Sequence, residues 1–209
     1  VRIDMLAGPS ELVVVADIGA APALVAADLL AQAEHDINAV PILIAMDESV
    51  VESVERELAS QLEALSTRTT ARAALNNGFA LIANNIEEAI ETCDGLAPEH
   101  LQLSLRNAPT IASQFTNYGA LFVGEQSGEV LGDYGAGPNH VLPTGGTARH
   151  TSGLSIFNFL RFPTQLRIDD SRLAQPIIDD AIELARLERL EGHRHAAVRR
   201  QREANTQVL

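Results

Sequence analysis

The sequence contains no lysine, and all fifteen basic residues among its 209 are arginine. This absence excludes chemistry that needs a lysine amine, such as a P-loop nucleotide site, a Schiff base or a Ser-Lys dyad. The single cysteine, Cys93, cannot form an internal disulfide, which fits a reducing cytoplasm. No apolar run approaches the ~20 residues that a membrane-spanning helix needs. The formal net charge of −13 argues against a nucleic-acid-binding surface over most of the chain.

What is present is enough apolar material for a buried core, because 46% of the residues are hydrophobic. Short apolar runs of strand length alternate with longer segments of helical pattern. Strands are expected at 12–16, 41–45, 79–83, 100–105 and 118–123, and helices at 21–34, 49–65, 86–93 and 108–115. This alternation predicts an α/β fold with an incomplete Rossmann-like parallel sheet and flanking helices, followed by a helical C-terminal tail.

The pattern changes after Gly124, where a glycine-rich stretch without periodicity runs over residues 126–153. A loop of this length inside a compact domain is usually functional or disordered, and its polar residues favour function. We therefore predict an α/β domain over residues 1–153 that carries an active-site loop at 126–153.

Residues 154–209 are predicted to form a linker and a helical tail, with the helix spanning about 172–204 and interrupted at Gly192. From Arg186 onward the tail carries six arginines against three acids, whereas the body is strongly acidic. The tail also has too little apolar surface to fold alone. Both features indicate self-association, with a solvated helix face as the alternative.

Gln32 and His35 close the second expected element. Positions i and i+3 share a helix face, so the two side chains can converge on one point. That point lies at the helix C-terminus, where the dipole favours a cation. A metal is one interpretation, and a capped surface helix end is the other.

Glu99 and His100 follow Pro98 at a loop-to-strand junction, which borders the ligand crevice of an open α/β sheet if it lies at the carboxyl edge. A glutamate–histidine pair can divide acid and base work at neutral pH, although an exposed Glu beside a turn His is also compatible. The stretch 132–140 adds a carboxylate, Asp133, and an imidazole, His140. It is not a G-x-G-x-x-G dinucleotide fingerprint.

Five motifs together resemble histidinol dehydrogenase, in family order and over essentially the whole chain. They are Ile3-Asp-Met-Leu-Ala-Gly-Pro-Ser-Glu11, Asp28-Leu-Leu-Ala-Gln-Ala-Glu-His35, Ala97-Pro-Glu-His-Leu101, Gly132-Asp-Tyr-Gly-Ala-Gly-Pro-Asn-His-Val-Leu-Pro-Thr144 and Glu188-Arg-Leu-Glu-Gly-His193.

The resemblance implies a zinc-dependent, cytoplasmic enzyme that oxidises L-histidinol to L-histidine in two NAD-linked steps through an aldehyde. It implies a homodimer in which each tail completes the partner's site. The zinc ligands carry over to Gln32, His35, Asp133 and His193. In the acid–base pair, His100 takes the alcohol proton and Glu99 activates water. Ser10, His140 and Glu188 are implied as further substrate contacts, beside the zinc ligands and His100.

The sequence departs from the family pattern in two places. Arg189 stands where the family usually has glycine, and His195 lies close enough to be the ligand in place of His193. We assign His193 because its spacing from Glu188 and the following Ala196 and Ala197 match the family.

Family members also carry a comparable length before Val1, so the chain is expected to be a C-terminal portion. Most nicotinamide contacts are then expected in the preceding half, which leaves the cofactor-binding residues unassigned. The isolated chain is expected to bind metal and to turn over poorly.

Three alternatives remain. One is a related zinc and NAD dehydrogenase of another small alcohol, such as a sulfonated propanediol. A second is a metal-binding, dimerising module without catalysis of its own. A zinc hydrolase is disfavoured because the sequence contains no His-Glu-x-x-His.

Overall fold

The computed structural model describes residues 8–170 and 172–206, so residues 3–7 of the first motif lie outside the described residues. By its internal contacts the chain divides into two compact units, the first ending at Leu160 and the second beginning at Arg161.

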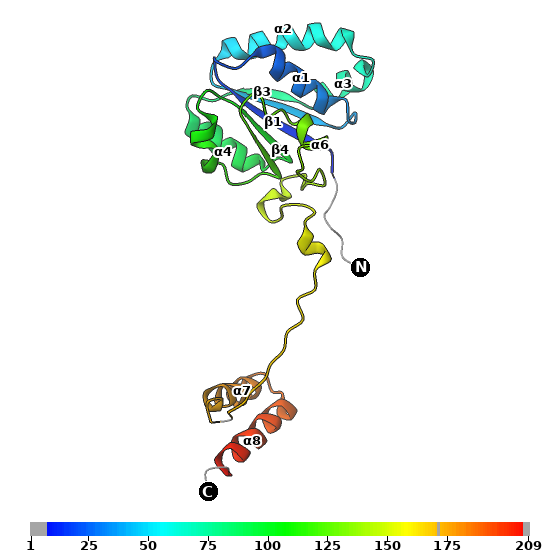
Figure 1. Cartoon of the computed structure of the whole chain (residues 1–209). Helices are drawn as coiled ribbons and strands as arrows, with labels where there is room; N and C mark the ends of the chain where they lie inside the picture. The colour runs from blue at the N-terminus through cyan, green and yellow to red at the C-terminus, as the bar shows by residue number, and fades with distance from the viewer. Residues whose placement is uncertain (1–7, 171, 207–209) are drawn as a thin grey trace. The chain divides into compact units, whose positions relative to one another are not determined.

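The first unit is built on a parallel five-stranded sheet in the order β3-β2-β1-β4-β5 (Figure 1). The strands are β1 (Glu11–Ala16), β2 (Val40–Ala45), β3 (Phe79–Ile82), β4 (His100–Ser104) and β5 (Ala120–Val123). This order is that of a classic Rossmann sheet without its sixth strand. The predicted α/β class with an incomplete parallel sheet is confirmed.

Helices cover both faces of this sheet (Figure 1). They are α1 (Pro22–Ala33), α2 (Glu48–Ala64), α3 (Arg68–Leu75), α4 (Ile86–Leu96) and the short α5 (Ala108–Ile111). Side chains of β1 alternate between the faces, so Leu12 and Val14 pack under α1 and α2, whereas Val13 and Val15 pack with α4. Cys93 lies in the α4 layer, where burial raises the pKa of its thiol to about 12. It is therefore a packed thiol and not a reactive one.

Helix α3 was not predicted from the sequence. Half of its eight residues are arginine or threonine, and only Ala71 and Ala74 are buried, in a small cluster with Leu30 and Leu62. Two alanines make too weak an apolar pattern to predict a helix, so tertiary packing decides this element. The glycine-rich stretch also contains local structure, namely α6 (Val130–Asp133) and a 3₁₀ turn at Thr147–Arg149.

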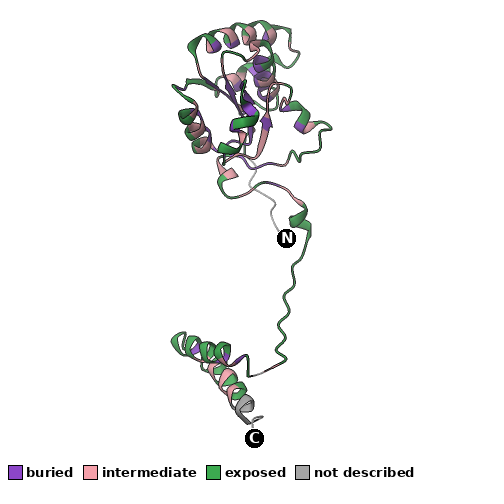
Figure 2. Cartoon of the chain, turned by 60° about the vertical axis from the view of Figure 1, so that its left-hand side comes forward, coloured by how far each residue is buried: buried purple, intermediate pink, exposed green. Residues whose placement is uncertain are grey.

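The second unit is a helical hairpin of α7 (Gln175–Leu187) and α8 (Glu191–Thr206), mostly exposed in Figure 2. The predicted interruption at Gly192 is wrong, because Gly192 lies inside α8. The chain turns at Arg189, which takes the left-handed conformation with φ 61°. The N–H of Leu190 donates to the carbonyl of Ala185 at 2.8 Å, which closes a Schellman turn. None of the helices in the described residues is both long and apolar enough to span a membrane.

Candidate metal and acid–base site

The predicted site residues of the first unit, with the exception of His140, gather at the amino edge of the sheet. Glu11 and His100 are the first residues of β1 and β4, and parallel strands begin at the same edge. Helix α1 runs back across the sheet, so its C-terminal end brings His35 to this edge as well. The junction at Glu99 therefore does not lie at the carboxyl edge, where open α/β sheets usually bind ligands.

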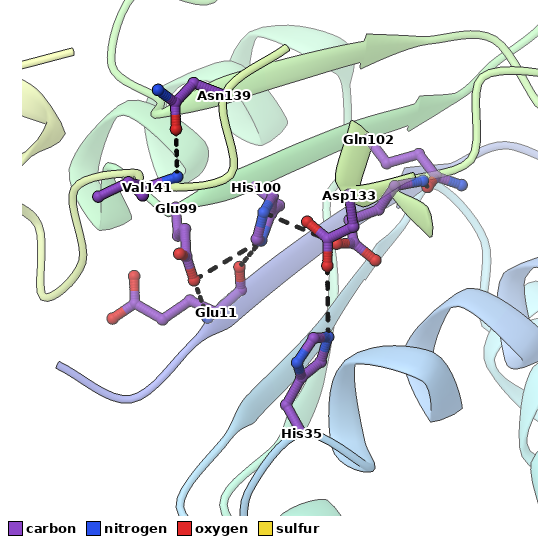
Figure 3. Close-up of polar contacts among 9 residues, drawn as sticks. Glu11, His35, Glu99, His100, Gln102, Asp133, Asn139 and Val141 are labelled. Carbon is purple, nitrogen blue, oxygen red and sulfur yellow. Dashed lines mark hydrogen bonds and ion pairs between the residues drawn. The ribbon is translucent and has the colours of Figure 1, made fainter. Parts of the chain in front are cut away.

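Glu99 and His100 converge although they are adjacent in the chain (Figure 3). Helix α4 ends at Ala97, whose φ of 49° is left-handed, and Pro98 follows, so the backbone turns just before β4. As a result Glu99 Oε2 lies 3.6 Å from His100 Nδ1. The same Oε2 accepts a hydrogen bond from the N–H of Glu11 at 3.1 Å.

The proton on His100 is located by its backbone partner. His100 Nδ1 lies 3.1 Å from the carbonyl oxygen of Glu11. A carbonyl oxygen only accepts, so Nδ1 carries the proton and Nε2 keeps its lone pair. Nε2 lies 3.7 Å from a carboxylate oxygen of Glu129.

Burial shifts the pKa values of this group in opposite directions. It lowers the pKa of His100 to about 4 and raises that of Glu99 to about 7, although hydrogen bonds from the Glu11 N–H and the Ser10 side chain lower the latter. Burial also raises the pKa of Glu129 to about 7. At neutral pH the imidazole is therefore an uncharged base, and Glu99 stands near its titration midpoint.

A group suited to a metal ion lies next to this pair. Ligand atoms of His35, Glu129 and Asp133 all lie within 4.8 Å of one another. His35 Nε2 and Asp133 Oδ2 are 3.9 Å apart, as Figure 3 shows. Helix α6 carries Asp133 to the end of α1.

Gln32 supplies a separate indication of a missing ligand. It is fully buried on α1, one turn before His35, and within the described part of the chain neither its side-chain oxygen nor its nitrogen has a hydrogen-bond partner. The buried Oε1 atom of Glu129 likewise has no hydrogen-bond partner there. Unpaired buried polar atoms are costly, and an ion that took the two oxygens as ligands would remove part of that cost. The nitrogen and oxygen donors present fit zinc.

Sequence reasoning missed Glu129. It lies one helical turn before Asp133 in a glycine-rich stretch, where an acidic residue is ordinarily exposed. Here it is 1% exposed, because α6 packs onto the polar face of β4. The i, i+4 spacing to Asp133 is the one signal in the sequence that points to it.

The structure places the other predicted site residues as follows. Ser10 lies beside Glu99, whose carboxyl it hydrogen-bonds. His140 is exposed on the glycine-rich stretch and is not in the group around Asp133. Glu188 and His193 belong to the second unit, where Glu188 caps the end of α7 and His193 is exposed on α8.

The second unit also separates the two candidate tail histidines. His195 Nε2 lies 3.7 Å from Glu191 Oε2 and 3.3 Å from Arg194 Nη2. Among the described residues His193 forms no hydrogen bond or ion pair. Its ring is therefore the freer of the two to act as a ligand.

The carboxyl edge of the sheet is occupied by the chain's own groups. The carboxylate of Glu125 accepts a hydrogen bond from the N–H of Ala21, at the N-terminus of α1. Dinucleotide-binding folds place a pyrophosphate at this helix end. A carboxylate there repels a phosphate, which agrees with the absence of the glycine fingerprint.

Comparisons with known proteins agree on one family for this chain. The family model described as histidinol dehydrogenase matches residues 1–201. The histidinol dehydrogenase of Geobacillus kaustophilus is 45% identical over 94% of this chain and 46% of its own length. That of Thermus thermophilus is 44% identical over 92% of this chain and 47% of its own.

Among solved structures, the histidinol dehydrogenase of Elizabethkingia anophelis superposes with a TM-score of 0.90 at 38% identity. The match covers 98% of this chain and 47% of that one. The chain thus spans about half the length of the relatives it matches.

Proposed function

We propose, since the chain belongs to the histidinol dehydrogenase family, that it forms the zinc-binding and acid–base half of a site that oxidises L-histidinol to L-histidine with NAD. The observation that carries the proposal is the grouping of His35, Glu129 and Asp133 beside the Glu99–His100 pair. The relatives above are all named histidinol dehydrogenase, which favours L-histidinol over another small alcohol as the substrate.

The residues that would hold zinc are Gln32, His35 and Asp133, and the family resemblance adds His193 from the tail of a second copy of the chain. Gln32 is supported by its unpaired buried amide, and His193 by its freedom from the pairing that engages His195. Bound there, zinc would polarise and orient the amino alcohol. Glu129 lies close enough to the same point to act either as a further ligand or as a contact to substrate.

His100 is proposed to act as the base in the first oxidation. Its Nε2 carries the lone pair, and its low pKa keeps it unprotonated at neutral pH. Nε2 would remove the alcohol proton as hydride leaves the same carbon for the nicotinamide. The hydrogen bond from Nδ1 to the Glu11 carbonyl holds the ring in this tautomer throughout.

Glu99 is proposed to act in the second oxidation. A carboxyl with a pKa of about 7 can accept a proton from water and return it at neutral pH. Water activated in this way would add to the aldehyde carbon and form the hydrate. The hydrate would then transfer a hydride to a second NAD and release its hydroxyl proton to a base, which yields the acid. Ser10 and the N–H of Glu11 hold the carboxyl in position.

The nicotinamide contacts are proposed to lie outside this chain. The helix end that would bind a pyrophosphate in a Rossmann fold is capped by Glu125. The matched relatives are about twice as long as this chain, so they have room for a cofactor-binding half. NAD supplies the hydride acceptor when bound there.

The second unit is proposed to join a homodimer. Helix α7 exposes Ile177, Leu184 and Leu187 at a spacing that places them on one helix face. An apolar stripe of this kind marks an interaction surface. The positive charge of α8 complements the acidic body, so a second copy of the chain is the favoured occupant.

A reducing cytoplasm also remains a prediction, and the buried free thiol of Cys93 fits it.

Three measurements on the purified chain test the proposal. Metal analysis after zinc loading is expected to give one zinc per chain, and calorimetric titration with L-histidinol is expected to give binding that is lost in the zinc-free protein. With NAD added, the chain alone is expected to form no NADH. A chain that retains no zinc and binds no histidinol would contradict the proposed site, and NADH formation would contradict the proposed location of the cofactor contacts.

A further inference from the structure

We infer that Gln102 is a positioning residue that holds α1 and α6, the two segments that carry the metal ligands, in the spacing that the site needs. The inference rests on the proposed zinc site. Gln102 itself touches none of the proposed ligand side chains, so its effect acts through Asp28 and the backbone of Glu129.

Gln102 forms a bridge between three elements. It lies on β4, and it is 1% exposed. Its Nε2 donates to Asp28 Oδ2 on α1 at 2.6 Å, and its Oε1 accepts from the backbone N–H of Glu129, at the start of α6, at 3.1 Å. One side-chain amide therefore joins both segments to the sheet.

The bridge lies one helical turn away from the proposed ligands on both α1 and α6. Asp28 precedes Gln32 by four residues on α1, and Glu129 precedes Asp133 by four residues at α6. Residues four apart share a helix face, about one 5.4 Å turn along the axis. A shift at Asp28 or Glu129 is therefore passed directly to Gln32 or Asp133.

The same relation holds on the strand. Gln102 follows His100 by two residues, and alternate residues of a strand face the same side. The bridge and the proposed base thus lie on one face of β4. Fixing α1 and α6 to Gln102 also fixes the side chains of both segments relative to His100.

The packing at Gly128 is independent support for a close approach here. A Cβ added to Gly128 would lie 3.2 Å from Asp28 Oδ1. The segment that enters α6 is thus pressed against α1 at the level of the bridge. A close contact between the Gly128 backbone and the Asp28 side chain transmits small displacements, because a packed interior does not absorb them.

The polarity of the amide matters as well as its size. One end of the side chain must donate to a carboxylate, and the other must accept from an N–H. Glutamate at position 102 would place a carboxylate against that of Asp28, and leucine would leave both partners unpaired in a buried site. Both hydrogen bonds are preserved when the two groups are exchanged, so that position 28 carries the amide and position 102 carries the carboxylate.

This exchange supplies the test. Gln102→Glu is expected to weaken zinc binding on the order of tenfold to a hundredfold, the usual effect of losing a group that orients metal ligands. The double variant Asp28→Asn/Gln102→Glu restores a donor opposite the carboxylate, and it is expected to recover affinity to within about threefold of the unmodified chain. Affinity is measured by competition with a chromophoric chelator, with Asp28→Asn alone as the matched control.

Equal zinc affinity in Gln102→Glu and the unmodified chain would overturn the inference. So would a double variant that stays as weak as Gln102→Glu, because the loss of affinity would then not come from the hydrogen bonds of the bridge. Thermal unfolding of the metal-free proteins separates loss of folding from loss of affinity.

If the unmodified chain binds no zinc, the proposed function is contradicted. The bridge is then tested in the metal-free protein. Hydrogen exchange at the Glu129 amide is then the measurement. Gln102→Leu is expected to accelerate it on the order of tenfold, the effect of losing a buried hydrogen bond. Unchanged exchange in a folded variant overturns the inference.

Discussion

The Nδ1 atom of His100 lies 3.1 Å from the backbone carbonyl oxygen of Glu11, and 3.6 Å from the carboxylate of Glu99. The carbonyl determines which ring nitrogen carries the proton, and the carboxylate is left free to titrate on its own. Two groups adjacent in sequence thereby receive different tasks. Because burial moves their pKa values to about 4 and about 7, each task can be tested separately.

Replacement of Glu99 by glutamine should affect the second oxidation more than the first. The amide cannot take a proton from water, whereas the base proposed for the alcohol, His100, is unchanged. In an assembled enzyme that includes the cofactor half, we expect oxidation of the aldehyde to fall by about two to four orders of magnitude, with a smaller loss for histidinol. Separate rates with the alcohol and the aldehyde as substrates give the comparison. Equal losses in both rates would exclude the water-activating role.

The same substitution should change how the stability of the zinc-free protein depends on pH. The pKa of Glu99 is raised from 4.5 to about 7, so the folded protein keeps a proton that the unfolded chain releases between these values. The contribution of Glu99 is therefore fully present below about pH 4.5 and falls as pH rises towards 7. Relative to the unmodified chain, Glu99→Gln should gain stability over this range, by at most about 1.4 kcal/mol per pH unit.

His100 changes the pH dependence of stability in the opposite direction, and it is present in both the unmodified chain and Glu99→Gln. Its pKa falls from 6.5 to about 4 on folding, so the unfolded chain binds a proton that the folded one refuses, and its contribution to stability grows as pH rises between these values. Urea unfolding of both proteins across the range from pH 4.5 to 7 measures the difference. Parallel curves for the two proteins would contradict the raised pKa of Glu99.

Replacement of His35 by asparagine should lower the zinc content of the chain. His35 supplies the imidazole of the three-residue group, and the remaining donors do not compensate for the loss of a residue that binds the ion directly. We expect metal analysis after dialysis to show well under half of the zinc found in the unmodified chain, since losing even a supporting group lowers metal affinity about tenfold or more. His150→Asn is the matched control, because His150 is exposed and lies outside the group. Equal zinc in all three proteins would remove His35 from the ligand set.

Mixing two defective chains tests whether the tail completes a neighbour's site. Asp133→Asn and His193→Asn each damage one proposed ligand, on different units. If the tail crosses between subunits, dissociation and reassociation of the mixture should restore about a quarter of the sites, because half of the dimers are mixed and each has one intact site. Zinc content and dimer mass of the mixture are measured together. No recovery in a mixture that has formed mixed dimers would assign the tail to its own chain.

Replacement of Gly192 by alanine should stabilise the helical hairpin. Gly192 lies inside α8, and a Cβ there would meet open space. Alanine in a helix is favoured over glycine by about 0.5–1 kcal/mol. Amide exchange in α8 should therefore slow by up to about fivefold. Arg189→Gly should act in the same direction, because Arg189 bears the left-handed turn. Faster exchange in Gly192→Ala would instead place the interruption at Gly192.

Much of the fold follows from local pattern. The run Leu12-Val-Val-Val is buried on both faces because a central parallel strand has no solvent face, and its apolar run is visible in the sequence. Pro22 at the start of α1 is likewise a local signal. Helix α3 and the position of the turn at Arg189 escaped prediction, because packing of two alanines and a backbone conformation unusual for arginine are not local preferences.

The sequence by itself determined the chemical types at the site, namely an imidazole–carboxylate pair after Pro98 and an i, i+3 pair at the end of α1. Only the tertiary structure decided that these groups meet at the amino edge of the sheet, because that depends on α1 running back across β1. It also decided that Glu129 joins them. The burial that raises the pKa of Glu129 and leaves its Oε1 without a hydrogen-bond partner among the described residues accompanies the packing of α6 on Gln102, a contact between residues 27 positions apart.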